Sequence, residues 1–385
     1  MAFQDHFTFF APTKLAVGRG TIDTIPQAII NRAAKKVLIV TDEGLVKAGL
    51  VRKLTDVLEA ASLDYALYDG VKENPPVAVV QACVGAYRSE GCDAMVAIGG
   101  GSSMDTAKAA GVLASNGGDI ESYFGVGKVK ERIPYLVCVP TTYGTGSEVT
   151  PFAVVTDDEH FKGAIVGPQI IPDVGVLDAD MAVALPMAIG AATGMDALTH
   201  AIESYTSLGA NPISDGLNLH AIQMISENLR EAIANDHNHE ATERMLMAST
   251  VAGIAFSQTR LGNVHAMSHA VSGHHGTPHG VANAIILARV MAYNRMGCPE
   301  RFGDIAAAMG EDVEGLAPMD AADLAVAAVR DLSRDVGIPE TLTEVDVPLE
   351  GIPEMAEDAM KSGNIQVNPR KTTLADVTKI FEQCF

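Results

Sequence analysis

The sequence predicts two domains, an α/β domain over residues 1–185 and an all-α domain over residues 186–385. A length of 385 residues with 48% hydrophobic residues is enough for two ordinary hydrophobic cores. In the first half, short β-branched runs alternate with stretches of helical periodicity, a pattern typical of parallel βαβ units. After Pro186 the strand-like runs stop, and helical apolar spacing interrupted by Gly and Pro continues.

The first half predicts its elements in chain order. Strands are expected at 35–42, 64–71, 93–100, 135–142, 152–157, 162–166 and 174–180. Helices are expected up to about Ala61, over 77–91 and from about Ser103 to Ser115. The last strands follow one another without room for crossover helices, so this domain is expected to end in less regular β structure. Helical spacing in the second half is clearest over 320–337 and 374–385.

Composition narrows the class of protein. The formal net charge of -21 disfavours nucleic acid and anionic membrane surfaces as partners. The five cysteines are scattered and form no C-x-x-C motif, which favours a reducing compartment over a disulfide framework. The N-terminus lacks the basic start of an export signal, and Pro186 interrupts the longest apolar stretch. We therefore expect a cytoplasmic protein without a membrane span.

A glycine-rich junction follows the third expected strand, in "VAIGGGSSMDTAK" at 96–108. Gly99, Gly100, Gly101 and Ser102 separate this strand from a helix, so free backbone N–H groups and the helix dipole suit a pyrophosphate. The spacing is not G-x-G-x-x-G and not a P-loop. A tight strand-to-helix turn that binds nothing is the alternative interpretation.

Two further features favour a dinucleotide. Asp42 ends the first strand, where a carboxylate can accept hydrogen bonds from a ribose diol and would repel a 2′-phosphate, which favours NAD over NADP. The run "PTTYGTGSEVT" at 140–150 follows another strand directly. Its hydroxyls and glycines are expected at the carboxyl edge of the sheet, where ligands of doubly wound folds bind.

Acidic and imidazole side chains recur at helical spacing in the second half. Asp196 and His200 are four residues apart in "GMDALTHAIESY", and His265 and His269 repeat this spacing in "HAMSHAVSGHHGTPHG". His279 follows in a Pro-His-Gly turn that is expected to open a helix. One carboxylate and three neutral imidazoles suit a divalent cation such as Fe²⁺ or Zn²⁺ and leave room for a substrate oxygen. Hydrogen bonds on helix surfaces are the alternative interpretation.

These motifs resemble those of the iron-containing, or group III, alcohol dehydrogenases. The resemblance runs from "FFAPTKLAVGRGTI" to "NPRKTTLADV", and "GGGSSMDTAK", "TTYGTGSEVT", "ATGMDALTHAIESY" and "GNVHAMSHAVSGHHGTPHGVANAIIL" occur in the family's order and spacing. It implies the dehydroquinate synthase-like fold, with an α/β dinucleotide-binding domain, a helical metal-binding domain and the active site in the cleft between them. It also implies a homodimer or higher homo-oligomer.

The resemblance implies a role for each matching position. The metal ligands would be Asp196, His200, His265 and His279. The NAD site would be lined by Asp42, Asn74, Gly99, Gly100, Gly101, Ser102, Thr141, Thr142, Thr145 and Lys162. His269 matches a position near the metal on the substrate side and is the candidate proton relay. The implied activity is hydride transfer between NAD(H) and a short-chain aldehyde or primary alcohol.

The chain departs from the family pattern around the expected substrate pocket, at Arg260, Asn263, His274, His275 and Thr277. A guanidinium with these neighbours could hold the anionic tail of a small aldehyde, such as sulfoacetaldehyde reduced to isethionate. Adjacent His274 and His275 cannot both face one point from a helix. The alternative places Arg260 at a helix C-terminus in water, with a neutral substrate such as lactaldehyde, 1,3-propanediol, ethanol or methanol.

Three other functions compete with this interpretation. A lyase of the dehydroquinate synthase type would also hold NAD and a metal but resembles a different set of motifs. A glycerol dehydrogenase shares the fold, but "HAMSH" with "TPHG" is more similar to the group III enzymes. A non-enzymatic scaffold would predict a damaged site, whereas all four ligand positions are intact here.

Overall fold

The computed structural model describes residues 6–157, 162–235 and 237–385. The chain divides into two units, one of residues 11–142 and 146–184, the other of residues up to Phe10, 143–145 and 185–385. The first is α/β and the second helical, so the predicted fold class is confirmed. Of the described residues, 6–10 and 143–145, which the sequence-based division assigns to the first domain, group with the helical unit.

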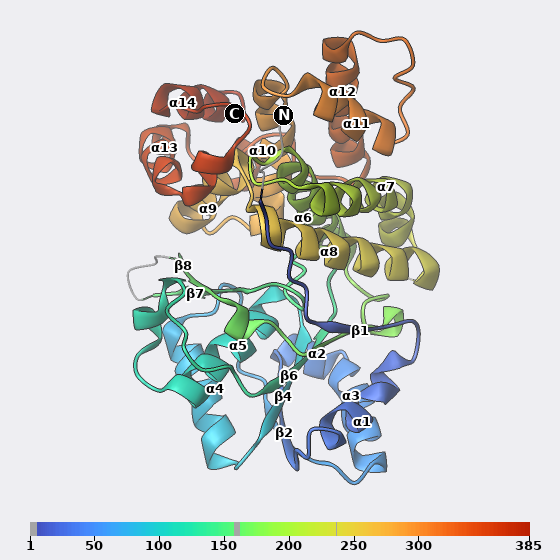
Figure 1. Cartoon of the computed structure of the whole chain (residues 1–385), viewed down its shortest axis with the longest axis vertical. Coiled ribbons are helices and arrows are strands. Elements are labelled where there is room, and N and C mark those ends of the chain that lie inside the picture. The colour runs from blue at the N-terminus through green and yellow to red at the C-terminus, as the bar shows by residue number, and fades with distance from the viewer. Residues whose placement is uncertain (1–5, 158–161, 236) are drawn as a thin grey trace. The chain divides into compact units, whose positions relative to one another are not determined.

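A six-stranded parallel sheet forms the centre of the α/β unit (Figure 1). In spatial order its strands are β1 (Lys14–Val17), β9 (Val174–Leu177), β6 (Tyr135–Pro140), β4 (Ala94–Gly99), β2 (Lys36–Val40) and β3 (Asp64–Tyr68). A smaller sheet joins β5 (Gly125–Val126), β8 (Lys162–Val166) and β7 (Phe152–Thr156), with β7 and β8 antiparallel. This small sheet is the less regular β structure that the sequence predicts.

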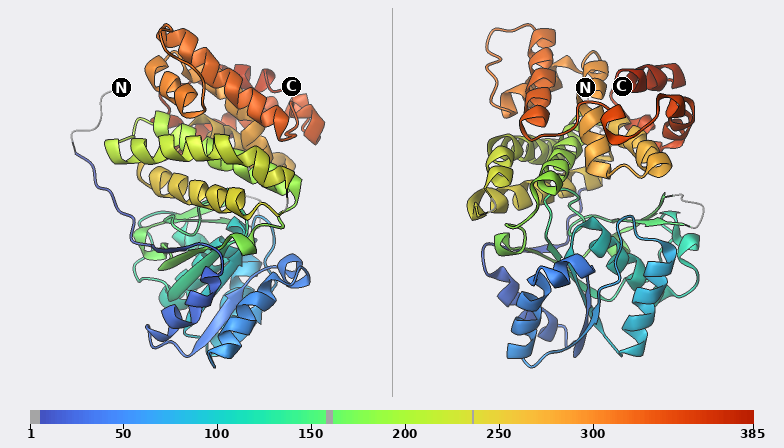
Figure 2. Two further views of the ribbon diagram at one scale, coloured as in Figure 1. Left: turned by 90° about the vertical axis from the view of Figure 1, so that its right-hand side faces the viewer. Right: turned by 180° about the vertical axis from the view of Figure 1, so that it is seen from behind.

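Helices cover both faces of the large sheet. They are α1 (Ile25–Ile30), α2 (Glu43–Lys47), α3 (Leu50–Ala60), α4 (Val77–Ser89) and α5 (Gly101–Asn116). Val37 and Ile39 of β2 belong to the core with α1 and α3, while Leu38 and Val40 belong to the core with α4 and α5. Figures 1 and 2 show these two helical layers on opposite sides of the strands. The continuous apolar runs in the strands follow from this two-sided burial.

Two details of the α/β unit differ from the sequence-based expectation. The helix expected up to about Ala61 is split into α2 and α3, because Gly49 between them adopts a left-handed φ of 77°. Strand β1 and helix α1 were not expected at all. They are only four and six residues long, and β1 pairs only with β9 at the edge of the sheet.

The second unit contains helices and no strand among its described residues. Its helices are α6 (Met187–Thr206), α7 (Pro212–Ala234), α8 (His239–Thr259), α9 (Asn263–His275), α10 (His279–Asn294), α11 (Pro299–Ala308), α12 (Pro318–Asp335), α13 (Ile352–Lys361) and α14 (Leu374–Glu382). Helix α6 packs against α7, α8 and α10, and its second half is almost entirely buried. Figure 2 shows the long helices α7 and α8 side by side.

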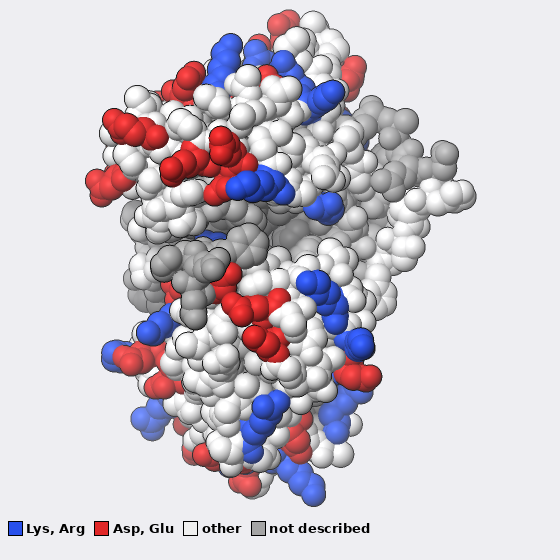
Figure 3. Space-filling view, turned by 90° about the vertical axis from the view of Figure 1, so that its left-hand side faces the viewer, with Lys and Arg blue, Asp and Glu red and all other residues white. Residues whose placement is uncertain are grey.

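The composition raises expectations about surface charge, cysteines and membrane spans, and the structure bears on each of them. Acidic and basic side chains are interspersed on the face shown in Figure 3. All five cysteines are buried and free of disulfides. In the described part of the chain, no helix has the length and hydropathy needed to cross a bilayer.

Helix α10 approaches the backbone of α6 closely at Gly280. A Cβ added there would lie 2.5 Å from the carbonyl oxygen of Ala192. This contact sets the position of the first turn of α10, which begins at His279. We expect Gly280→Ala to separate the two helices and to destabilise the unit by about 1–3 kcal/mol, although alanine favours a helix by up to ~1 kcal/mol.

Thermal unfolding measures this effect, with Gly216→Ala as the matched control. Gly216 lies in α7, and a Cβ there would meet no atom within 4 Å. We expect the control to unfold at an unchanged or higher temperature. A Gly280→Ala variant as stable as the control would contradict the close packing of α10 on α6.

Candidate functional site

Three helices of the second unit bring the predicted metal ligands together. Oδ1 of Asp196 lies 3.8 Å from Nε2 of His265 and 3.9 Å from Nε2 of both His279 and His200. The donor atoms of Asp196, His265 and His279 all lie within 4.8 Å of one another. Ligand atoms about 2.0–2.2 Å from a tetrahedral ion lie roughly 3.5 Å apart. The donor set therefore fits one divalent cation, with His200 at the edge of the cluster.

The imidazole rings pack against one another. His200 and His265 stack with centroids 4.6 Å apart, and the centroid of His279 lies 5.3 Å from that of His265. Phe256 of α8 stacks on the other side of His200 at 4.4 Å. Burial, reinforced by the neighbouring imidazoles, holds the pKa of His265 well below 6.5. His265 is therefore neutral at physiological pH, which is the state that a metal ligand requires.

His269 lies beside this cluster. Its ring centroid is 5.1 Å from that of His279 and 6.0 Å from that of His265. It is exposed, whereas Asp196, His200 and His265 are buried. A side chain between the cluster and solvent is suitably placed to move protons, which is the role predicted for it.

The sequence analysis missed Glu203, a buried acidic residue on the ligand-bearing face of α6. Its Oε2 lies 2.6 Å from Nδ1 of His265, and its Oε1 accepts a hydrogen bond from the Val264 N–H at 2.6 Å. Burial raises the pKa of Glu203 to about 7, although backbone hydrogen bonds oppose the shift. Its position seven residues after Asp196, and three after His200, is the helical signal that could have identified it.

Asn283 of α10 is the second residue that the sequence analysis missed. Its Nδ2 donates to Oδ1 of Asp196 at 2.6 Å and lies 3.2 Å from Nε2 of His265 and 3.1 Å from Nε2 of His279. Its Oδ1 is buried, with no hydrogen-bond partner among the described residues. The spacing of four residues from His279 places Asn283 on the same face of α10.

His200 is oriented by a carbonyl group. Its Nδ1 lies 3.2 Å from the carbonyl oxygen of Gly144, which can only accept, so Nδ1 carries the proton and Nε2 is free to bind a metal. A Cβ on Gly144 would lie 2.8 Å from Cβ of Thr193. Glycine therefore allows this segment to approach α6 closely enough to reach His200.

In the α/β unit, two groups of predicted cofactor residues lie at adjacent strand ends. Gly99 at the end of β4 pairs with Pro140 at the end of β6, and the Thr141 N–H donates to the Gly99 carbonyl at 3.0 Å. Gly99 has a φ of 149°, and Ser103 leaves no space for a side chain on it. Gly100 is the N-cap of α5, so the N–H groups of Gly101 and Ser102 begin this helix. Thr142 lies next to Gly100.

The other predicted cofactor residues lie around this edge and the small sheet. Asp42 caps α2 by accepting from the Leu45 N–H at 3.1 Å, and Asn74 has a φ of 48°. Lys162 pairs with Thr156 in the small sheet, and the Thr156 N–H donates to the Pro75 carbonyl at 2.9 Å. Burial lowers the pKa of Lys162. Thr145 lies in the segment 143–145 that groups with the helical unit.

The buried side chain of Lys108 fixes the segment that follows Thr145 through hydrogen bonds. Nζ of Lys108 donates to Oγ of Ser147 at 2.8 Å and to the Phe152 carbonyl at 2.8 Å. Ser147 in turn donates to Oδ1 of Asp105 at 2.8 Å. Burial lowers the pKa of Lys108 and raises that of Asp105. Lys108 therefore anchors this segment to α5.

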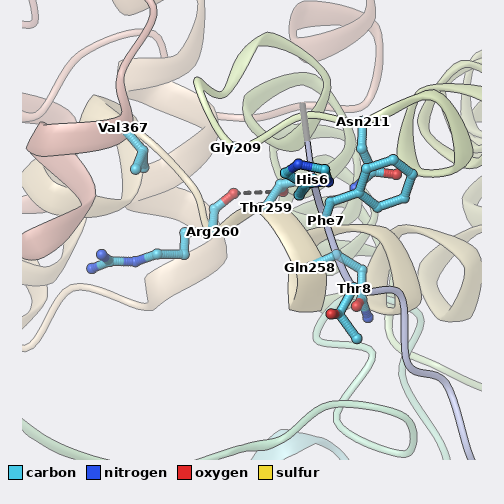
Figure 4. A pocket seen from close by; sticks show the side chains of 9 residues that line it. All are labelled: His6, Phe7, Thr8, Gly209, Asn211, Gln258, Thr259, Arg260 and Val367. Carbon is cyan, nitrogen blue, oxygen red and sulfur yellow. Dashed lines mark hydrogen bonds between the residues drawn. The ribbon is translucent and has the colours of Figure 1, made fainter. Parts of the chain in front are cut away.

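Arg260, a predicted substrate residue, is exposed at the C-terminus of α8 and has a φ of 62°. It lines a pocket of about 450 Å³ with residues of the N-terminal segment and with Gly209, Asn211, Gln258, Thr259 and Val367. In Figure 4 its guanidinium points away from His6, Phe7 and Gln258. Gly363 leaves the space that the guanidinium occupies. None of the four predicted metal ligands lines this pocket.

The other predicted substrate residues contact different parts of the helical unit. Asn263 is buried, and its Nδ2 donates to Thr372 at 2.8 Å. Nε2 of His274 lies 2.6 Å from Oδ2 of Asp358 in α13. The imidazole of His275 lies beside Gly351, and Thr277 is buried. Arg260, Asn263 and His274 contact three different partners, which are Gly363, Thr372 and Asp358. These contacts therefore do not define one substrate site.

The chain matches known proteins over nearly its whole length. Residues 12–179 match the profile "Iron-containing alcohol dehydrogenase", and residues 190–385 match "Fe-containing alcohol dehydrogenase family, C-terminal". The chain is 42% identical to 1,3-propanediol dehydrogenase of Klebsiella pneumoniae over 98% of its own length and 99% of the relative's. It is 43% identical to lactaldehyde reductase of Escherichia coli K12, over 94% and 96% of the two lengths.

Solved structures agree with these sequence matches. A crystal structure of 1,3-propanediol oxidoreductase superposes with a TM-score of 0.97 at 42% identity, covering 99% of this chain and all of the other. Sulfoacetaldehyde reductase from Bifidobacterium kashiwanohense in complex with NAD⁺ superposes with a TM-score of 0.90 at 29% identity, covering 99% of both chains. The chain therefore belongs to the iron-containing alcohol dehydrogenase family of oxidoreductases.

Proposed function

We propose that this enzyme transfers hydride between NAD(H) and a short-chain primary alcohol or aldehyde, with one divalent metal, Fe²⁺ in preference to Zn²⁺. The observation that carries the proposal is the convergence of Asp196, His265 and His279 donor atoms within 4.8 Å, next to Nε2 of His200. The relatives named above are dehydrogenases and reductases, which favours this reaction over a lyase or a scaffold.

The metal supplies Lewis-acid polarisation of the substrate oxygen, and NAD(H) supplies the hydride acceptor or donor. Asp196, His200, His265 and His279 would hold the metal. Gly99 to Ser102 and Thr141 would hold the pyrophosphate with N–H and hydroxyl groups at the start of α5, and Asp42 would accept from the ribose hydroxyls. His269, exposed beside the ligand cluster, would exchange the alcohol proton with solvent.

We propose a neutral substrate in preference to one with an anionic tail. The two curated relatives at 42–43% identity are named for 1,3-propanediol and lactaldehyde, whereas the sulfoacetaldehyde reductase is 29% identical. The guanidinium of Arg260, the group that would bind an anion, lies beside Gly363 and points away from His6, Phe7 and Gln258. Reduction of sulfoacetaldehyde remains the second candidate, supported by that structural neighbour.

We also propose that the enzyme is cytoplasmic and that it forms a homo-oligomer. Five free, buried cysteines and no disulfide among the described residues support a reducing compartment, the cytoplasm. The family resemblance supports a homodimer or a higher homo-oligomer.

The first prediction of the proposed function concerns the metal. The purified protein is expected to bind about one divalent metal per chain and to lose activity with a chelator. His265→Ala and His279→Ala should lose both metal and activity, and elemental analysis with a reductase assay measures this. His220→Ala, an exposed histidine in α7, is the control and should lose neither. Full metal occupancy in His279→Ala would contradict the assignment.

The second prediction concerns the choice of cofactor. A like-charge contact costs several kcal/mol, so kcat/KM with NADPH should be at least about a hundredfold lower than with NADH. Asp42→Ser removes the charge but keeps an N-cap acceptor for α2. It should lower the ratio of kcat/KM with NADH to kcat/KM with NADPH, while the melting temperature changes little. Asp42→Gly should lower the ratio of kcat/KM with NADH to kcat/KM with NADPH as well. If the wild-type enzyme had similar kcat/KM values with NADH and NADPH, Asp42 would not be the residue that binds the ribose hydroxyls.

The third prediction separates the two substrate classes. With a neutral substrate, Arg260→Ala should leave kcat/KM for lactaldehyde nearly unchanged, because a neutral aldehyde has no anionic group for the guanidinium to bind. If sulfoacetaldehyde is instead the substrate, a charge-assisted contact of roughly 1.5–3 kcal/mol is lost, and kcat/KM should fall about ten- to a hundredfold for it alone. Assaying both aldehydes with wild type and variant decides between the two.

A further inference from the structure

Glu203 is a buried carboxylate that meets the start of α9. Its Oε1 accepts from the Val264 N–H at 2.6 Å, and its Oε2 lies 3.3 Å from the His265 backbone nitrogen and 2.6 Å from His265 Nδ1. Thus one carboxylate binds both the backbone of the first turn of α9 and the side chain of a predicted metal ligand.

This geometry determines which nitrogen of His265 carries the proton. In its ionised form, which the backbone N–H groups of Val264 and His265 favour, the Glu203 carboxylate can only accept hydrogen bonds, and the separation of 2.6 Å then places a proton on Nδ1. With one proton on the neutral ring, Nε2 keeps its lone pair. Nε2 is the atom that lies 3.8 Å from Oδ1 of Asp196, on the side of the predicted metal.

Capping of α9 alone does not explain a buried charge. A neutral group performs the same task nearby, because Oδ1 of Asn368 accepts from the Asn263 N–H at 3.3 Å. A buried carboxylate costs more free energy than a buried amide unless a cation lies close to it. When both are ionised, Asp196 and Glu203 together carry two negative charges, which match one divalent cation. His200, by contrast, is oriented by the neutral carbonyl of Gly144.

We propose that Glu203 is a positioning residue for the metal, which holds His265 in its Nδ1–H tautomer with the Nε2 lone pair facing the ion. This inference rests on the proposed metal-dependent function. Carboxylates behind a metal-bound histidine typically increase metal affinity by 10- to 100-fold. Glu203 thereby adds charge to the centre without being a ligand.

Glu203→Gln tests the proposal, since the side chain keeps its size. The glutamine amide can still accept from the Val264 N–H with its oxygen, but its NH₂ group then faces His265. The ring must now accept at Nδ1, which moves the proton to Nε2 and blocks metal binding. Zn²⁺ affinity of the full-length metal-free protein, measured by competition with a chromophoric chelator, is expected to fall about 10- to 100-fold.

Asn368→Ala is the matched control. It removes a neutral acceptor from the same helix start, where no ligand side chain is touched, so it should lower the melting temperature without changing Zn²⁺ affinity. Equal affinity of Glu203→Gln and wild type would overturn the proposal, as would an equal loss in Asn368→Ala. A wild-type protein that binds neither Zn²⁺ nor Fe²⁺ would instead reject the proposed metal dependence, and this inference with it.

A measurement on the wild type does not depend on the folding of a variant. In the Zn²⁺-loaded protein labelled with ¹⁵N-histidine, two-bond ¹H–¹⁵N correlations identify the protonated ring nitrogen of each histidine. We expect His265 to carry its proton on Nδ1. A proton on Nε2 of His265 would overturn the proposal.

Discussion

The buried carboxylate of Asp196 is the interaction on which the helical unit depends. Its Oδ1 lies within 3.9 Å of three imidazole nitrogens and accepts from Asn283 at 2.6 Å. These partners come from α6, α9 and α10, so one atom marks the point where three helices converge. An isolated carboxylate at this depth would be costly. The convergence of donors around it makes the site suitable for a cation and unfavourable for an apolar ligand.

Each predicted metal ligand is oriented by a different contact. His200 is held by the carbonyl of Gly144, and His265 by the carboxylate of Glu203. His279 begins α10, whose distance from α6 is set by the close contact at Gly280. Glycine is required at 144 and 280 because backbone approaches backbone there. The predicted metal ligands are therefore positioned by helix packing, which depends on glycines at the close contacts.

Local spacing explains what the sequence could predict. The i, i+4 pairs of Asp196 with His200 and of His265 with His269 follow from one helix each, and alternation of strands and helices predicted the fold class. Glu203 carries a helical signal too, but its partner lies 62 residues away in another helix. The break at Gly49 depends on a single left-handed residue, and β1 is too short for periodicity. Of these, only the role of Glu203 depends on a contact between distant segments.

The turn between α8 and α9 illustrates how backbone demands can determine side-chain identity. A Cβ on Gly262 would lie 2.9 Å from Oε1 of Glu203, so only glycine lets the carboxylate reach the first N–H groups of α9. Two residues earlier, Arg260 adopts a left-handed φ of 62° to end α8, a conformation that costs a non-glycine residue about 1 kcal/mol or more. Glycine would satisfy that backbone without strain. The arginine at position 260 therefore makes the turn that places Gly262 beside Glu203 more costly to form.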